Sequence, residues 1–159
     1  MKITISKCQN IVNLLEALEN ESYDEKGKIN PRLSYAINKI NIIILKKLFS
    51  KEVGFKDTFK KYLEYQNKTN ELKKKCFKNK LNESGVETTD KIFDNELFNK
   101  ELKTLEEENK ELLEKYLEFQ TKEIIIDGDS LYKIKLFYLP EKLSKYIIDR
   151  LNEFDLLME

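Results

Sequence analysis

The feature that most constrains the fold is the segment 98–119, where large side chains recur at alternating intervals of four and three residues. This spacing is typical of a helix that packs along one seam against a partner helix. The apolar seam residues are Phe98, Leu102, Leu105, Leu112, Tyr116 and Phe119. Asn109 fills the remaining seam position, where a polar residue sets register and oligomeric state. We therefore expect a long helix, about residues 90–120, that needs a partner helix.

Opposite charges divide the helical region into two parts. Residues 31–82 contain 14 basic and 4 acidic side chains, whereas residues 83–120 contain 5 basic and 12 acidic side chains. Oppositely charged helices joined by a short loop are expected to lie side by side, which predicts an antiparallel helical hairpin over about residues 31–120. The same pattern is compatible with pairing between two chains. We therefore also expect self-association into a homodimer through apolar surface left on these helices.

A helix start lies at Asn30 and Pro31, where an N-cap oxygen precedes a proline that suits the first helical turn. The helix that follows carries Ile42 and Ile43 off its main apolar stripe, so we expect it to be the central core helix. Gly54 then predicts a kink or short turn, because glycine costs about 1 kcal/mol inside a helix. Beyond it, helical spacing resumes at Phe55, Phe59, Tyr62 and Leu63.

Short β-rich segments flank the helical region. Residues 2–5 alternate polar and apolar side chains, and residues 122–126 and 131–139 are β-rich on either side of a four-residue loop, 127–130. We expect these three segments to form a small antiparallel three-stranded sheet. The segment between the two halves of the helical hairpin, residues 81–90, reads as a surface loop.

Pro140 starts a C-terminal helix, about residues 140–157. A chain of 159 residues is long enough to bury one core and short for two ordinary domains. The predicted fold class is therefore α+β, mainly α, in a single domain over residues 1–159.

The sequence lacks the usual motifs for catalysis, metals and cofactors. It contains no histidine, and its two cysteines, Cys8 and Cys76, form no CxxC pair, so we expect buried free thiols and no metal. The segment 127–129 resembles part of a calcium loop but lacks the remaining oxygen ligands, which favours a turn. Without a glycine-rich phosphate loop or a nucleophile elbow, we expect no enzyme activity and no cofactor.

No run of about 18 apolar residues occurs, so we expect no membrane span. The first residues lack the continuous apolar core of a signal peptide, which predicts a cytoplasmic protein; a bacterial host is implied only by the resemblance described below.

The segment 55–80 interleaves aromatic residues with lysines, as a surface that binds single-stranded nucleic acid would. A helix with a buried aromatic stripe and a solvated lysine face fits the same pattern, and we favour it because the acidic helix offers a nearer partner. Only two arginines are present, which weakens the case for phosphate recognition. The expected interaction residues are Lys73, Lys74, Lys75, Phe77, Glu106, Glu107 and Asn109.

The order of elements resembles a family of small uncharacterised proteins encoded by bacteriophages of low-GC bacteria. The features that carry this resemblance are the MKITI strand, a short helix, long helices and the FNKELKTLEEENKELLEKYLEF helix leading into TKEIII. The chain departs from that outline around residues 51–90. The resemblance implies a phage or mobile-element origin and a small accessory role.

We therefore expect a non-enzymatic protein-binding factor that inhibits a host defence complex, in the manner of anti-CRISPR or other anti-defence proteins. Two alternatives stay open. One is a nucleic-acid or nucleotide-signal binding module that uses residues 55–80, and the other is a phage assembly or scaffold protein.

Overall fold

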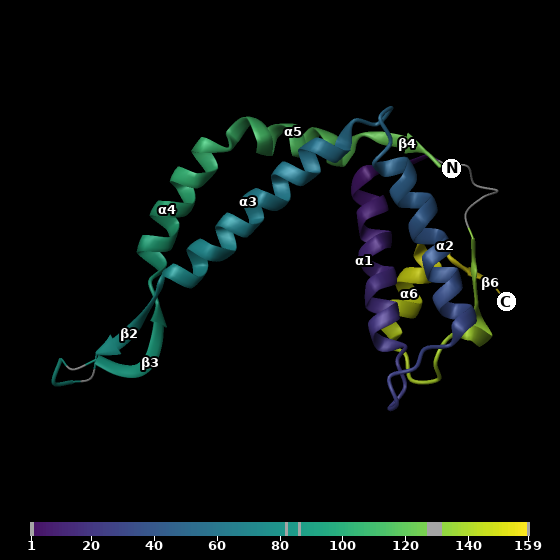
Figure 1. The fold of residues 1–159 in the computed structure, drawn as a ribbon, viewed down its shortest axis with the longest axis horizontal. Helices are drawn as coiled ribbons and strands as arrows, with labels where there is room; N and C mark the ends of the chain where they lie inside the picture. Colours follow the sequence, from purple (N-terminus) through teal and green to yellow (C-terminus); the bar gives the residue numbers. More distant parts are fainter. Residues whose placement is uncertain (1, 82, 86, 127–131, 159) are drawn as a thin grey trace. The chain divides into compact units, whose positions relative to one another are not determined.

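The computed structural model describes residues 2–81, 83–85, 87–126 and 132–158. It is 63% helical and has short two-stranded sheets, which confirms the predicted mainly α, α+β fold class. The chain divides into two compact units (Figure 1). Unit 1 comprises Met1–Lys56 and Phe119–Glu159, and unit 2 comprises Asp57–Glu118. The expectation of a single domain stays a prediction, because two compact units can still unfold together.

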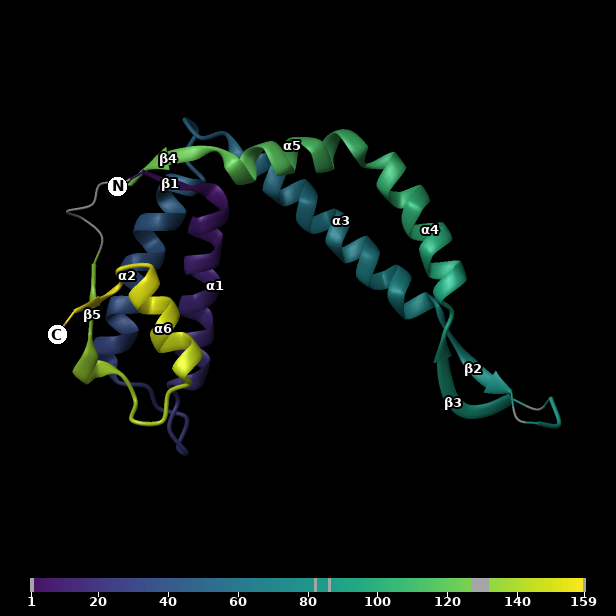
Figure 2. The ribbon, with the colours of Figure 1, turned by 180° about the vertical axis from the view of Figure 1, so that it is seen from behind.

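Three helices form the core of unit 1: α1 (Ile5–Glu21), α2 (Pro31–Leu48) and α6 (Lys145–Glu153). Helix α1 packs against both α2 and α6, and Figure 2 shows α6 lying across α1. The predicted helix start is confirmed, since the Asn30 side chain accepts a hydrogen bond from the Arg32 amide at 2.9 Å. The fully buried side chains of these helices include Ile11, Leu15, Leu18, Leu33, Ile40, Ile44 and Leu151. Apolar stripes on three helices therefore make one continuous core.

The expectation that α2 is the most completely buried helix is wrong. The side chain of Ile42 is exposed and that of Ile43 is only half-buried, so part of the outer side of α2 is uncovered. Helix α1 takes the central position instead, since it has neighbours on two sides.

Two of the three predicted strands form an antiparallel sheet. Strand β1 (Lys2–Thr4) pairs antiparallel with β4 (Glu123–Ile125). The predicted third strand is wrong in length and in partner: β5 (Ile134–Lys135) pairs in parallel with β6 (Leu157–Met158), after the C-terminal helix. Burial of the Ile134 side chain and a 2.8 Å bond from its amide to the Leu156 carbonyl fix this pairing. The predicted loop at 127–130 lies outside the described residues.

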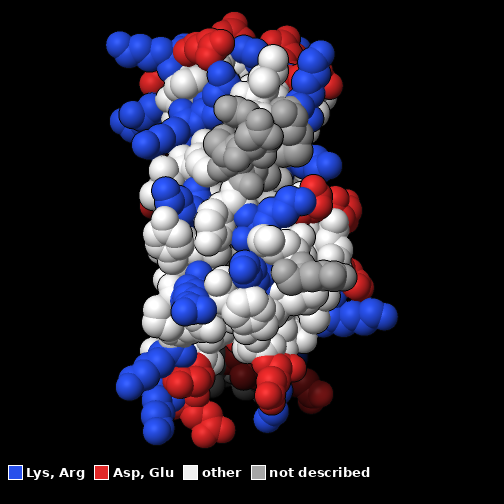
Figure 3. Space-filling model, turned by 90° about the vertical axis from the view of Figure 1, so that its right-hand side faces the viewer, with Lys and Arg blue, Asp and Glu red and all other residues white. Residues whose placement is uncertain are grey.

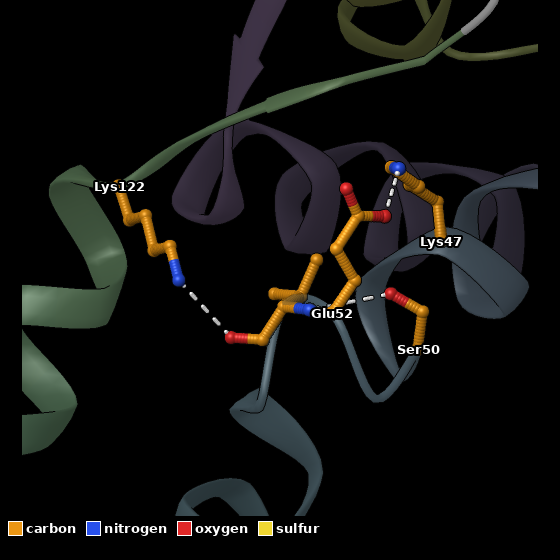
Figure 4. Close-up of polar contacts among 5 residues, drawn as sticks. Lys47, Ser50, Glu52 and Lys122 are labelled. Carbon is orange, nitrogen blue, oxygen red and sulfur yellow. Dashed lines mark hydrogen bonds and ion pairs between the residues drawn. The ribbon is translucent and has the colours of Figure 1, made fainter.

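The chain passes from α2 to α3 (Phe55–Lys75) through a turn at residues 49–54, which confirms the break predicted at Gly54. Gly54 has a φ of +71°, a backbone conformation that favours glycine. The Val53 amide donates to the Ser50 hydroxyl at 3.4 Å, and the Lys122 ammonium donates to the Val53 carbonyl at 3.1 Å (Figure 4). These bonds tie the turn to the segment that leads into β4.

Because α2 belongs to unit 1, the prediction that the helical hairpin begins near residue 31 is wrong. The hairpin in unit 2 starts with α3 and returns through α4 (Asn95–Glu108) and α5 (Lys110–Thr121). The connection between α3 and α4 also differs from the prediction. Most of the described residues in 81–90, which were predicted to form a loop, belong to an antiparallel β-hairpin of β2 (Phe77–Leu81) and β3 (Glu87–Phe93). Helix α4 starts later than the predicted residue 90, because Asp94 is its N-cap.

Candidate interaction surface

The seam between α3 and the returning helices holds unit 2 together. The predicted seam residues of α4 and α5 are all half-buried, and the ring of Tyr116 stacks on that of Tyr62 in α3. On α3 the half-buried side chains are Phe59, Tyr62, Tyr65, Thr69 and Leu72. Leu63, which we placed on the apolar stripe, is instead exposed. The aromatic stripe of α3 is thus turned toward α5, as the preferred reading of segment 55–80 expects.

Asn109 separates α4 from α5 and is the C-cap of α4. Its side-chain amide donates to the Leu105 carbonyl at 2.8 Å, and its backbone amide bonds to the same helical turn. The side-chain amide shares the Leu105 carbonyl with the backbone amide of the same residue, and this competition weakens the helix locally, which accounts for the break. The structure therefore gives Asn109 a role within its own helix, and its role in setting an oligomeric state stays a prediction.

A polar groove of about 770 Å³ lies between α3 and the junction of α4 with α5 at Asn109. Helix α3 lines it with Lys61 and Lys68, among others, and the other side contributes Glu107, Asn109 and Glu111. Lysines and carboxylates lie on both walls, so the groove has no dominant sign of charge.

The expected interaction residues fall in separate places. Glu107 and Asn109 line the groove, while Glu106 is exposed on α4 outside it. Lys73, Lys74 and Lys75 form the last turn of α3, where positive charge complements the helix dipole. Phe77 begins β2, directly after these lysines. The structure therefore joins the lysines and Phe77 at the base of the β-hairpin.

Large apolar side chains are exposed around this β-hairpin. Phe77 is 49% exposed, Leu81 59%, Ile92 48% and Leu97 43%. We call these four residues the hairpin surface. Leu81 and Ile92 were missed from the sequence because the turn residues around Ser84 and Gly85 favour a loop; the run of Thr88, Thr89, Ile92 and Phe93 carried the only signal for a strand.

Aromatic contacts and one ion pair fix the base of the β-hairpin. Phe93 contacts Phe77 and Phe98, with ring centroids 5.0 Å and 5.3 Å apart. The Asp94 carboxylate accepts hydrogen bonds from the Lys78 ammonium at 2.8 Å and from the Leu97 amide at 3.1 Å. The Asp94 amide donates to the Cys76 carbonyl at 2.8 Å. This residue therefore links α3, the β-hairpin and the start of α4.

The same hydrogen bonds shift the pKa values of Asp94 and Lys78. The bond from Lys78, followed by that from the Leu97 amide, lowers the pKa of Asp94 below its ordinary value. The bond to Asp94 raises the pKa of Lys78. Both charged forms are therefore favoured in the folded state.

Other features bear on the classes of function considered. Both cysteines are free and buried, as the sequence predicts. Within the described part of the chain, no cluster of three or more acidic or cysteine side chains is placed to hold a metal ion, and no helix is long and apolar enough to cross a membrane. No family model, curated protein or solved structure matches the chain.

Proposed function

We propose that the protein is a non-enzymatic binding factor whose docking element is the hairpin surface of unit 2. The observation that carries this proposal is the exposure of Phe77, Leu81, Ile92 and Leu97 on one small substructure. The register pairs Phe77 with Phe93 and Ile92 with Lys78, so Phe77 and Ile92 lie on opposite faces of the β-hairpin. Exposed apolar side chains on both faces favour an interaction site, since their burial in a complex releases ordered water.

The geometry of the β-hairpin adds a mode of binding. Among the described residues, β2 and β3 pair only with each other, so each strand keeps an outer edge for a further strand. A partner protein that adds a strand to such an edge gains backbone hydrogen bonds, and exposed side chains provide selectivity. The Lys73–Lys75 turn beside the hairpin supplies positive charge that steers an acidic partner.

The proposed target is a host defence complex, a target that suits the small accessory role implied by the resemblance to bacteriophage proteins. The same surface suits a role in phage assembly. The nucleic-acid alternative is less favoured, because Tyr62 and Tyr65 of segment 55–80 are half-buried in the seam and Tyr62 is stacked on Tyr116. Base stacking needs open ring faces.

The test is capture of a partner by the full chain from nuclease-treated bacterial lysate. The informative variant is Leu81→Lys with Ile92→Lys, which places charge on two exposed positions of the hairpin surface. The control is Tyr146→Ser, at an exposed position in unit 1. Circular dichroism checks that each variant keeps the helix content of the wild type.

We expect a stoichiometric partner with the wild type and the control, and its loss with the double variant. A partner retained by the double variant would remove the hairpin surface from the proposal. Salt-sensitive binding to oligonucleotides that is lost in Lys73→Glu/Lys74→Glu/Lys75→Glu, with no protein captured, would replace it by the nucleic-acid alternative.

A further inference from the structure

We propose a second docking surface, on unit 1, that binds an acidic and apolar segment of a partner protein. This surface, which we call the basic face, is formed by the outer side of α2 and by residues 132–138. It lies outside the hairpin surface, and its chemistry differs because cations and aromatic rings alternate on it.

The sequence of the basic face is free of acidic residues. Helix α2 and residues 132–138 contain six basic residues and no aspartate or glutamate, although the whole chain contains 29 acidic residues. The six are Arg32, Lys39, Lys46, Lys47, Lys133 and Lys135. Two of them pair with carboxylates that lie elsewhere in the chain: Lys47 with Glu52 and Lys133 with Asp155. The face therefore presents a local positive charge on a chain with no net charge.

The two segments form one continuous surface. Helix α2 packs against β5, and the rings of Tyr35 and Tyr132 meet edge to face with centroids 5.9 Å apart. At the start of α2, the Asn30 side-chain amide donates to the Tyr138 carbonyl at 3.5 Å. Figure 3 views this side of unit 1, with lysine and arginine side chains scattered among uncharged atoms over its middle, and acidic side chains at both ends and along one edge.

Apolar side chains on this face are as exposed as those of the hairpin surface. Phe137 is 65% exposed, Tyr35 54%, Ile42 49% and Leu136 48%. A hollow of about 360 Å³ lies beside Phe137 and Tyr138 at the start of α2, lined also by Pro31 and Arg32. A hollow with an aromatic wall accepts one apolar anchor of a partner, the arrangement typical of binding hot spots.

The cations on this face lie over rings. Lys39 is 5.8 Å from the centroid of Tyr35, Lys135 is 5.6 Å from that of Phe137, and the Arg32 guanidinium is 5.9 Å from that of Tyr138. Among the described residues, no ion pair joins these three cations to a carboxylate. These three cations are therefore held over aromatic rings without a carboxylate of the described chain as counterion. Carboxylates of a partner protein can supply the charge-assisted hydrogen bonds that they lack.

An acidic protein segment fits this surface better than nucleic acid does. Ile42 and Leu136 gain from burial against apolar side chains but gain nothing from phosphates. Tyr35 and Phe137 each have a lysine over the ring, and base stacking would need to displace it. A segment that carries carboxylates beside large apolar residues satisfies both the cations and the aliphatic side chains.

The test measures binding of a designed amphipathic helical peptide of leucine and glutamate to the full chain, by fluorescence anisotropy. A peptide with lysine in place of glutamate and a single-stranded oligothymidylate are the comparison probes. The variants are Arg32→Glu/Lys39→Glu/Lys135→Glu, and separately Phe137→Ser, which leaves the charge unchanged. The control for net charge is Lys26→Glu/Lys142→Glu/Lys145→Glu, at three exposed positions of unit 1 outside α2 and residues 132–138.

We expect the acidic peptide to bind, the charge-reversed basic face to weaken it roughly tenfold or more, and the control to change it less than about twofold. Phe137→Ser should also weaken binding, which nonspecific attraction between charges does not predict. Equal weakening by the control, no effect of Phe137→Ser, or no binding of the acidic peptide would overturn the proposal. Tighter binding of the oligothymidylate than of the peptide would assign the face to nucleic acid.

This inference is separate from the proposed function of unit 2. The Leu81→Lys/Ile92→Lys variant should bind the acidic peptide as the wild type does, because both substitutions lie in unit 2. Loss of peptide binding in that variant would show that the two surfaces are not independent. If both proposals hold, the protein has two docking surfaces and can bring two partners together.

Discussion

The ring of Tyr62 on α3 stacks on the ring of Tyr116 on α5, with centroids 3.7 Å apart and planes inclined by 6°. This pair joins the two sides of the seam in unit 2. Only Thr58 and Cys76 are buried among the described residues of that unit, so half-buried contacts of this kind must hold it together. The stacked pair should therefore contribute measurably to stability.

The first prediction concerns the coupling of this pair. A double-mutant cycle with Tyr62→Leu and Tyr116→Leu should give a coupling free energy of about 0.5 to 1.5 kcal/mol, because ring stacking adds to simple burial. Urea denaturation of the four proteins measures it. Tyr23→Leu combined with Tyr62→Leu serves as the control, since Tyr23 is exposed in unit 1; that pair should be additive. A coupling free energy no larger than that of the control pair would show that the stacked rings do not stabilise unit 2 beyond simple burial.

The sequence predicted the seam because its signal is local. Alternating intervals of four and three residues along one helix require no knowledge of distant partners, and Asn30, Pro31 and Gly54 act within a few residues of their own positions. The same reasoning placed Asn109 at a seam position. Its capping bond to Leu105 was not foreseen, since a competing side-chain bond depends on the local backbone.

Pairings between distant segments were harder to predict. In the β-hairpin, Phe77 lies opposite Phe93. The sequence did not indicate this pairing, because Gly85 and its polar neighbours favour a surface loop. Ile134 and Leu157 pair in parallel, with the whole of α6 between them in the chain. No tight turn joins these strands, so no local turn motif could have predicted the pairing. Of the expected interaction residues, Lys73–Lys75 lie just before Phe77 at the base of the β-hairpin, whereas Glu106 is exposed on α4 outside the groove.

The second prediction concerns the helix break. Replacing Asn109 by leucine should extend the helix through the break and raise the free energy of unfolding by about 0.5 kcal/mol or more, because leucine is the better helix former and completes the apolar seam. Circular dichroism and urea denaturation measure both effects. A loss of stability would instead show that the bond from Asn109 to Leu105 and the bent path are required.

Light scattering on the wild type and on Asn109→Leu tests the expected self-association. A dimer whose size changes in the variant would support a register role for Asn109. Strict monomers in both proteins would exclude that role and leave the hairpin within one chain intact.

The third prediction uses the two cysteines to compare the units. Both thiols are buried, and burial raises the pKa of Cys8 to about 11, so neither should react while its surroundings stay closed. Unit 2 buries few side chains and should open at a lower free energy cost than unit 1. Alkylation under native conditions, followed by mass spectrometry, should label Cys76 at least about tenfold faster than Cys8. Equal rates would mean that the chain opens as one cooperative domain, as its length predicts.

The last prediction follows from the lowered pKa of Asp94. Because this pKa is lower in the folded than in the unfolded state, the stabilisation is fully present above the unfolded value and is lost as the pH falls through the folded value. Asp94→Asn should therefore be less stable than the wild type at neutral pH, and the difference should shrink in acid. Lys78→Met removes the first cause of the shift but keeps the bond from Leu97, so its acid dependence should fall between the two. Urea denaturation between pH 2 and 7 measures all three proteins, and a constant difference between Asp94→Asn and the wild type across this range would contradict the assignment.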